Sequence, residues 1–90
     1  MREVKFTSAF KKSYKRMKKR GKNLTLLDDV IDDLRQGKTL PAKFRDHALK
    51  GNFNGFRECH VQPDWLLIYE IHEEVLVLML YRLGSHAELF

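Results

Sequence analysis

The sequence has 90 residues, of which 43 % are hydrophobic, and its formal net charge is +5 at pH 7. This length fits a single domain, and the apolar fraction is that of a folded globular protein rather than a disordered chain. No apolar run approaches the roughly 20 residues that span a bilayer, and the first residues do not resemble a secretory signal. A single cysteine cannot form an internal disulfide, which is typical of a reducing compartment. We therefore expect a cytoplasmic protein.

The positive charge is concentrated at one end of the chain. Residues 1–22 contain ten Lys and Arg against one Glu, a balance of +9, whereas residues 23–90 have a balance of −4. A basic surface confined to one element favours a polyanionic partner such as RNA or DNA. The same pattern is also typical of a solvated helix face, and composition alone leaves both interpretations open.

The N-terminal part of the chain predicts one strand and one helix. Residues 2–6 alternate between outward and inward side chains, which indicates a short strand. Thr7 or Ser8 can cap the helix that follows, which we expect to end near Gly21. Its lysines would lie on the solvent side. Its apolar stripe would consist of Phe6, Phe10, Tyr14 and Met17.

A second helix is predicted between Asn23, its capping residue, and Gly37. Aspartates occupy its outer face. Its core stripe would consist of Leu24, Leu27, Ile31 and Leu34. Because the first helix is basic and the second is acidic, we expect an antiparallel helical hairpin with a complementary charged seam.

The rest of the chain predicts a loop at residues 38–44 and then three β-rich runs, Phe53–Val61, Leu66–Ile71 and Val75–Leu83. Short connections imply adjacent antiparallel strands, and nearly continuous apolar runs imply at least one strand buried on both faces. The element order is therefore β-α-α-β-β-β. We expect one α+β domain over residues 1–90, with a twisted, mainly antiparallel sheet and the helical hairpin packed on one face.

Three of the four histidines lie in short polar segments flanked by turns. His47 lies in the loop that enters the sheet, His60 ends the second strand, and His86 follows the last strand. If the last three strands form a meander, the ends of the second and fourth strands point the same way. His60 and His86 would then share one sheet edge with Asp64 and Trp65.

Such a group has the side chains needed to cleave RNA. A general base can take the proton of a ribose 2′-hydroxyl, which attacks its own phosphorus, while a general acid protonates the leaving 5′-oxygen. Two imidazoles suit these tasks, and Asp64 could orient one imidazole, raise its pKa, or serve as the base. Charge on the phosphoryl oxygens needs a cation, and unpaired bases are held by stacking. The candidate cations are Lys50, Arg57 and Arg82, and the candidate stacking residues are Trp65 and Phe90.

Simpler interpretations stay open for each of these residues. Isolated loop histidines are usually polar surface residues, and Trp65 and Phe90 could be core or sheet-edge packing. Zinc takes His and Asp ligands, but the sequence lacks closely spaced ligand pairs such as His-x₃-His, so we expect no metal or other cofactor. Cys59 lies within a strand and has no activating helix N-terminus, so we expect it to be half-buried and inert.

Three segments together resemble a known family. They are D-H-x-L-x-G at residues 46–51, C-H-V-x-P-D-W at residues 59–65 and G-x-H-x-x-L-F at residues 84–90. In this order they resemble the YafQ branch of the RelE/ParE toxin superfamily, whereas the first half of the chain matches only in its strand and two helices. The resemblance implies a RelE-like fold and the toxin of a bacterial type II toxin–antitoxin system. Such toxins are ribosome-dependent endoribonucleases that cut mRNA in the A site without a metal.

The resemblance also implies roles for individual residues. The family's catalytic and aromatic positions fall on His47, His60, Asp64, Trp65, His86 and Phe90. We expect His86 to be the general acid or base, with Asp64 or His60 as its counterpart. His47 would position the scissile phosphate, and Arg82 would clamp it.

The implied partners are the ribosome, mRNA and a cognate antitoxin of ribbon-helix-helix type, through which alone the toxin would bind operator DNA. The basic helix fits this setting, because the ribosomal A site is walled by RNA. The lysines expected to contact ribosomal RNA are Lys11, Lys12, Lys15, Lys18 and Lys19. Two alternatives are a ParE-type gyrase inhibitor on the same fold, which has no need of a His/Asp cluster, and a non-catalytic RNA-binding module.

Overall fold

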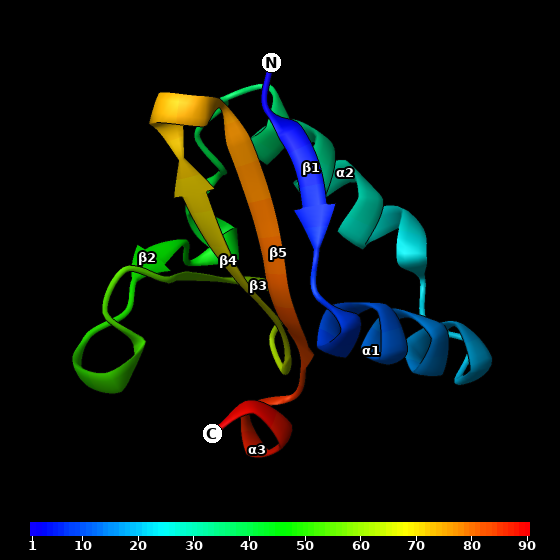
Figure 1. The fold of residues 1–90 in the computed structure, drawn as a ribbon. Coiled ribbons are helices and arrows are strands. Elements are labelled where there is room, and N and C mark those ends of the chain that lie inside the picture. Colours follow the sequence, from blue (N-terminus) through cyan, green and yellow to red (C-terminus); the bar gives the residue numbers. More distant parts are fainter.

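A mixed, mostly antiparallel five-stranded sheet forms the centre of the protein (Figure 1), in the strand order β1-β5-β4-β3-β2. The three long strands, β3 (Arg57–Gln62), β4 (Trp65–His72) and β5 (Val77–Gly84), form the predicted antiparallel meander. β1 (Glu3–Phe6) lies parallel to β5 at one edge, and β2 (His47–Ala48) pairs with β3 at the other. The predicted α+β fold is confirmed, with β2 as an additional short strand.

The structure, a computed structural model, describes all of residues 1–90. α1 (Ser8–Lys19) and α2 (Leu24–Arg35) begin at predicted capping residues. The side chains of Thr7 and Asn23 each accept a hydrogen bond of 3.0 Å from a backbone N–H in the first turn of the helix that follows. Both helices contribute to one core against the same face of the sheet. No helix combines the length and the apolar character needed to cross a membrane.

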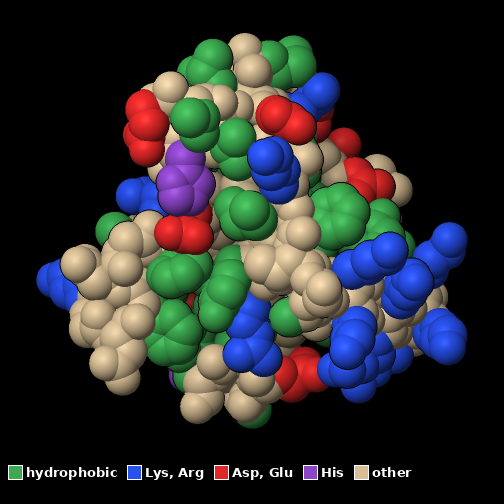
Figure 2. Space-filling model, in the orientation of Figure 1, with side chains coloured by type: hydrophobic (Ala, Val, Ile, Leu, Met, Phe, Trp, Pro, Cys, Tyr) green, Lys and Arg blue, Asp and Glu red, His purple; other side chains and the backbone are tan.

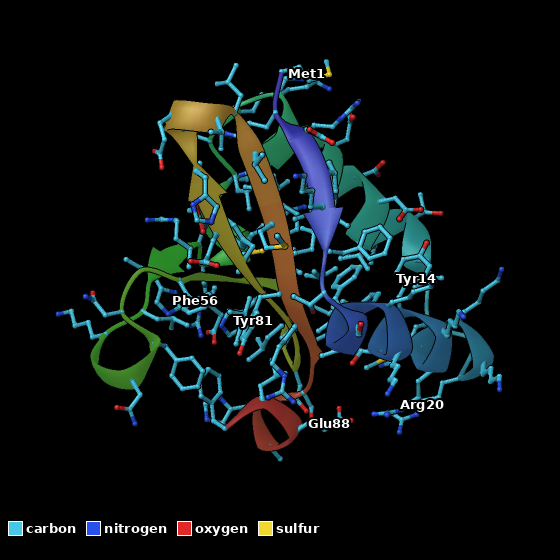
Figure 3. The ribbon with its side chains drawn as sticks, viewed as in Figure 1. Met1, Tyr14, Arg20, Phe56, Tyr81 and Glu88 are labelled. Atoms are coloured by element: carbon cyan, nitrogen blue, oxygen red, sulfur yellow. The ribbon has the colours of Figure 1, made fainter.

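β4 is buried on both faces over its first five residues, as predicted for one strand of the sheet. Its side chains toward α1 and α2 are Trp65, Leu67 and Tyr69. Those toward the opposite face of the sheet are Leu66 and Ile68. This second face is partly covered by α3 (His86–Leu89), a short helix that the sequence did not predict. Figure 3 labels two further side chains of this face, Phe56 and Tyr81, whose ring centroids are 4.6 Å apart.

The packing of the two long helices differs from the prediction in three respects. They do not form the predicted antiparallel hairpin, because their axes diverge and each packs on the sheet rather than along the other (Figure 1). Phe10 and Met17 are buried, but Phe6 is 54 % exposed, because it ends the edge strand β1 before the helix begins. The predicted charged seam is wrong: no ion pair joins α1 to α2, and the Tyr14 hydroxyl instead donates a 3.3 Å hydrogen bond to Asp28. The lysines of α1 are exposed, and there they keep their hydration.

Two details of β3 also differ from the prediction. The strand begins at Arg57 rather than Phe53, because residues 51–53 form a 3-10 turn and Gly55 has a positive φ of 98°. Cys59 is fully buried rather than half-buried, since it lies on the side of β3 that faces the helices. Burial raises the pKa of its thiol, which disfavours the reactive thiolate.

Candidate active site

The structure places His60, Asp64 and His86 at one end of the sheet, where β3 and β5 end and β4 begins. In the cross-strand register His60 lies opposite Leu66, which lies opposite Gly84, so His60 and the start of α3 are two strands, about 10 Å, apart. The Asp64 carboxylate, in the turn between β3 and β4, accepts a 3.2 Å hydrogen bond from the backbone N–H of His86. Asp64 therefore holds the backbone of His86 rather than its imidazole ring.

A buried carboxylate, that of Glu58, lies close to both His47 and His60. Glu58 was not among the residues predicted from the sequence. Glu58 is 5 % exposed and lies on β3, two residues before His60 and on the same face. The pairing of β2 with β3 sets His47 directly opposite Glu58. Glu58 Oε1 lies 3.5 Å from Nε2 of His60 and 3.7 Å from Nε2 of His47. The i, i+2 spacing of Glu58 and His60 in a predicted strand could have placed both side chains on one face. No sequence pattern indicates that His47 pairs with Glu58.

Backbone carbonyls orient both imidazoles. Nδ1 of His60 lies 3.2 Å from the carbonyl oxygen of Pro63, and Nδ1 of His47 lies 2.7 Å from that of Arg45. Because a carbonyl oxygen only accepts hydrogen bonds, Nδ1 carries the proton in both rings. Nε2 is then the atom at which each ring can take a further proton, and it faces Glu58. No group of three His, Cys, Asp or Glu side chains is arranged to hold a metal ion.

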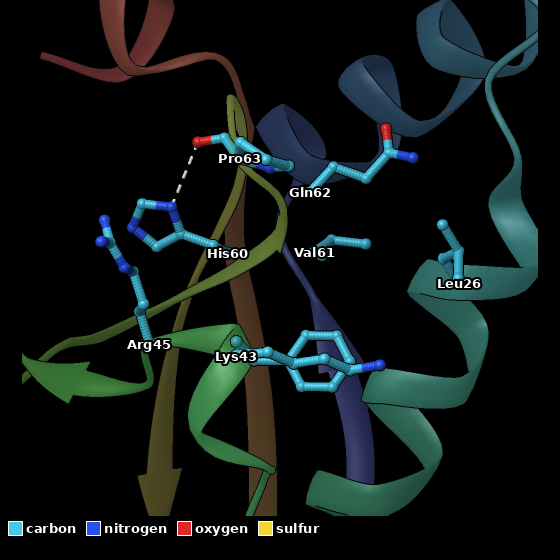
Figure 4. A pocket seen from close by; sticks show the side chains of 8 residues that line it. Leu26, Lys43, Arg45, His60, Val61, Gln62 and Pro63 are labelled. Atoms are coloured by element: carbon cyan, nitrogen blue, oxygen red, sulfur yellow. Dashed lines mark hydrogen bonds between the residues drawn. The ribbon is translucent and has the colours of Figure 1, made fainter.

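A cavity of about 600 Å³ opens beside His60 (Figure 4). Lys43 and Arg45 contribute two cations to its wall, and Leu26 and Val61 contribute apolar surface. The sequence did not single out these cations. Lys43 lies in a 3-10 turn, Ala42–Phe44, that packs against β3, and Arg45 follows that turn. Positive charge beside an imidazole suits the binding of a phosphate group.

Two of the three predicted cations lie in positions consistent with substrate binding. Arg82 shares a cross-strand row with Ile68 and Glu58, and paired residues in such a row share one face of the sheet. Arg82 therefore lies with Glu58 and His60 on the face of the sheet opposite α1 and α2. Lys50 is exposed in the loop after β2.

Arg57 has a different environment from the one predicted. It lies on the other face of β3, where its guanidinium donates to Asp46 at 3.2 Å, and the Tyr69 hydroxyl donates to the same carboxylate. The hydrogen bond to Asp46 raises the pKa of Arg57. Arg57 thus holds the loop before β2 in place and faces away from the imidazoles.

The two predicted stacking aromatics also differ from one another. Trp65 is 1 % exposed within the main core, so it cannot stack on a base as predicted, and its indole Nε1 has no hydrogen-bond partner. Phe90 is 51 % exposed. Its ring packs on those of Phe53 and His86, with centroids 5.1 and 5.0 Å away. Phe90 is therefore the aromatic that leaves surface free for a base.

The predicted lysines of α1 are all exposed, and Figure 2 shows Lys and Arg side chains gathered over this helix. They lie on two sides of it. A purely cationic hollow of about 290 Å³ is lined by Lys12, Lys15, Arg16 and Lys19. Lys11 and Lys18, together with Lys15, which borders both hollows, line an apolar groove of about 440 Å³. Only the first side is purely basic.

Comparison with known proteins identifies the family of this chain. Residues 2–90 match the family described as "Bacterial toxin of type II toxin-antitoxin system, YafQ". The mRNA interferase toxin YafQ of Escherichia coli (strain K12) is 36 % identical over 90 residues, which cover 99 % of this chain and 96 % of the relative.

Solved structures give the same result. A metal-bound toxin from Helicobacter pylori is 43 % identical, and the match covers 100 % of both chains with a TM-score of 0.95. YafQ in the E. coli DinJ–YafQ complex is 35 % identical with a TM-score of 0.90, covering 100 % of this chain and 99 % of that chain. The chain therefore belongs to the YafQ family of toxins from type II toxin–antitoxin systems, within the RelE/ParE superfamily.

Proposed function

We propose that this protein is a ribosome-dependent mRNA interferase, an endoribonuclease that cuts mRNA in the ribosomal A site and inhibits translation. The observation that carries the proposal is the group of His47, Glu58 and His60 on the same sheet face as Arg82. This group lies near the end of the sheet at which β5 leads into His86. The name of the E. coli relative, an mRNA interferase toxin, supports the same activity.

The geometry supports separate roles on the two sides of the scissile phosphate. His60 Nε2 takes the proton of the 2′-hydroxyl, and the Glu58 carboxylate stabilises the imidazolium that results. The 2′-oxygen bonds to phosphorus while the bond to the 5′-oxygen breaks, and His86 gives its proton to that oxygen. The products are a 2′,3′-cyclic phosphate and a 5′-hydroxyl. Arg82 stabilises the charge on the phosphoryl oxygens, and His47 positions the phosphate.

Other residues position the reacting groups and the RNA. Asp64 fixes the backbone of His86, so we assign it a positioning role. Phe90 has an exposed ring beside His86, where it can stack on an unpaired base. Lys43 and Arg45 would bind the neighbouring phosphates from the cavity beside His60.

The partners proposed for this chain are the ribosome and an antitoxin. The cationic side of α1 would hold the protein against ribosomal RNA by neutralising phosphates. A cognate antitoxin of ribbon-helix-helix type would cover the site and carry the complex to operator DNA. Support for an antitoxin comes from E. coli YafQ, which is seen in complex with DinJ.

The test is cleavage of one reporter mRNA in a purified translation system, with and without ribosomes, with the 5′ ends mapped by primer extension. We expect codon-phased cuts that require ribosomes and disappear in the His86→Ala variant. In cells induced to make the protein, intact mRNA with stalled DNA replication would instead indicate ParE-type gyrase inhibition. RNA binding without cleavage would indicate a non-catalytic module.

A further inference from the structure

α3 is too short to be stable alone, yet it carries His86. It has four residues, and an isolated helix of that length does not persist in water. The imidazole of His86 makes no hydrogen bond within the protein, and its aromatic neighbour is Phe90, with ring centroids 5.0 Å apart. The position of the imidazole therefore depends on the groups that hold the backbone of α3.

Two carboxylates accept hydrogen bonds from the start of α3. The Ser85 backbone N–H donates to Glu88 Oε1 at 2.9 Å, and the Ser85 hydroxyl accepts from the Glu88 backbone N–H at 3.3 Å. The next N–H, that of His86, donates to Asp64. Two successive backbone donors at the first turn are thus satisfied by Glu88 and Asp64, as in a capping box with an added partner.

Glu88 also connects α3 to the basic helix α1. Its Oε2 lies 3.6 Å from Nη1 of Arg16, and Figure 3 shows Glu88 and Arg20 at the same end of the molecule. Hydrogen bonds from the backbone and side chain of Ser85 lower the pKa of Glu88, and the nearby Arg20 and Arg16 charges lower it further. The carboxylate is therefore ionised at neutral pH, in the form that accepts hydrogen bonds best.

The end of β5 leaves room for this arrangement. A Cβ atom at Gly84 would lie 3.3 Å from Glu88 Oε1 and 3.4 Å from Glu88 Cβ, closer than most side chains tolerate. With glycine at this position the Glu88 side chain can fold back over the last residue of the strand. Leu89, the next residue, is buried against Leu66 and Ile68 and anchors the other side of the helix.

We propose that Glu88 is a positioning residue for His86: its carboxylate fixes the start of α3 and ties it to α1 through Arg16, which holds the imidazole against the substrate phosphate. Glu88 falls on an unspecified position of the G-x-H-x-x-L-F motif, so the family resemblance assigns it no role. The inference rests on the proposed function, because it assumes that His86 takes part in the cleavage.

The test compares cleavage kinetics of four variants on programmed ribosomes. Glu88→Ala removes the cap, and we expect kcat to fall about five- to tenfold with KM unchanged, the size typical of a lost helix cap. Glu88→Gln keeps an oxygen that accepts from Ser85 but loses the charge that pairs with Arg16, so its kcat should lie between those of the wild type and Glu88→Ala. Glu74→Ala is the control, since Glu74 is exposed and lies in the distant turn between β4 and β5. His86→Ala is the inactive reference.

A wild-type kcat for Glu88→Ala beside an inactive His86→Ala would overturn the inference and leave the proposed function intact. An increase in KM alone would also overturn it, because Glu88 would then act on ribosome binding through α1. Wild-type cleavage by His86→Ala would reject the proposed chemistry itself. If Glu88→Ala does not fold, Ser85→Ala removes the other half of the same capping box, and a wild-type kcat there overturns the inference.

Discussion

Replacing Glu58 with Gln removes the negative charge between His47 and His60 while it preserves the size of the side chain. Two unit charges about 4 Å apart near a protein surface interact by roughly 4 kcal/mol at an effective dielectric constant near 20. Water weakens this interaction, because the His60 and His47 side chains are 19 % and 50 % exposed. If a third to two-thirds of it persists, the loss is roughly 1.4–2.7 kcal/mol, which lowers kcat by a factor of about 10 to 100.

The assay is single-turnover cleavage of a reporter mRNA on programmed ribosomes, with the free energy of unfolding measured in parallel. The matched control is Glu70→Gln, because Glu70 Oε1 lies 3.8 Å from Nε2 of His72 in a similar pair outside the site. We expect a slower reaction with Glu58→Gln and an unchanged one with Glu70→Gln. Wild-type cleavage by Glu58→Gln, or an equal loss in both variants, would refute the assignment of Glu58 to the catalytic group.

Three further predictions follow from the same geometry. Trp65→Phe should keep cleavage within about twofold of wild type, because the buried ring does not meet RNA, and its free energy of unfolding in urea should change by no more than about 1 kcal/mol, since lost volume is offset by removal of an unpaired N–H. The triple variant Lys12→Glu, Lys15→Glu, Lys19→Glu should bind ribosomes more weakly in sedimentation assays, and the slope of log Kd against log salt should fall by roughly 2–3. Hydrogen bonds lower the pKa of Glu88, so its stabilising effect is complete above the ordinary Glu pKa of about 4.3 and is lost as the pH falls through the lower folded value. Urea denaturation should therefore show a less stable Glu88→Gln variant at pH 6, and the difference should shrink as the pH falls below the ordinary Glu pKa.

Most elements could be predicted because their signals are local. A capping side chain and an apolar stripe at three- and four-residue spacing define a helix within one short window, and Thr7 and Asn23 cap their helices as expected. Short connections between β-rich runs imply the meander. The meander in turn places the C-terminal ends of β3 and β5 at the same end of the sheet, which is why His60 and His86 were expected near each other.

The features that escaped prediction depend on contacts between distant segments. Nothing in the residues around His47 shows that they pair with β3, and without that pairing the link to Glu58 is invisible. Strand alternation sets Trp65 on one face of β4 but does not show which face the helices cover, so Trp65 was predicted to stack on a base although core packing stayed open. α3 was missed although Ser85 and Glu88 have the spacing of a capping box, because four residues carry no helical periodicity.

The aromatic contacts of Phe90 have a practical consequence for experiments on this protein. Its ring packs on those of Phe53 and His86, so the C-terminal end of the chain adjoins the end of the sheet that carries the candidate site, whereas the N-terminus lies at the opposite end of the molecule (Figure 1). Residues fused after Phe90 would start beside His86, where the proposed mechanism places the mRNA. A C-terminal tag would therefore mimic a loss-of-function mutation although every side chain of the site is intact. Tags placed before Met1 avoid this artefact in both growth-arrest and cleavage assays.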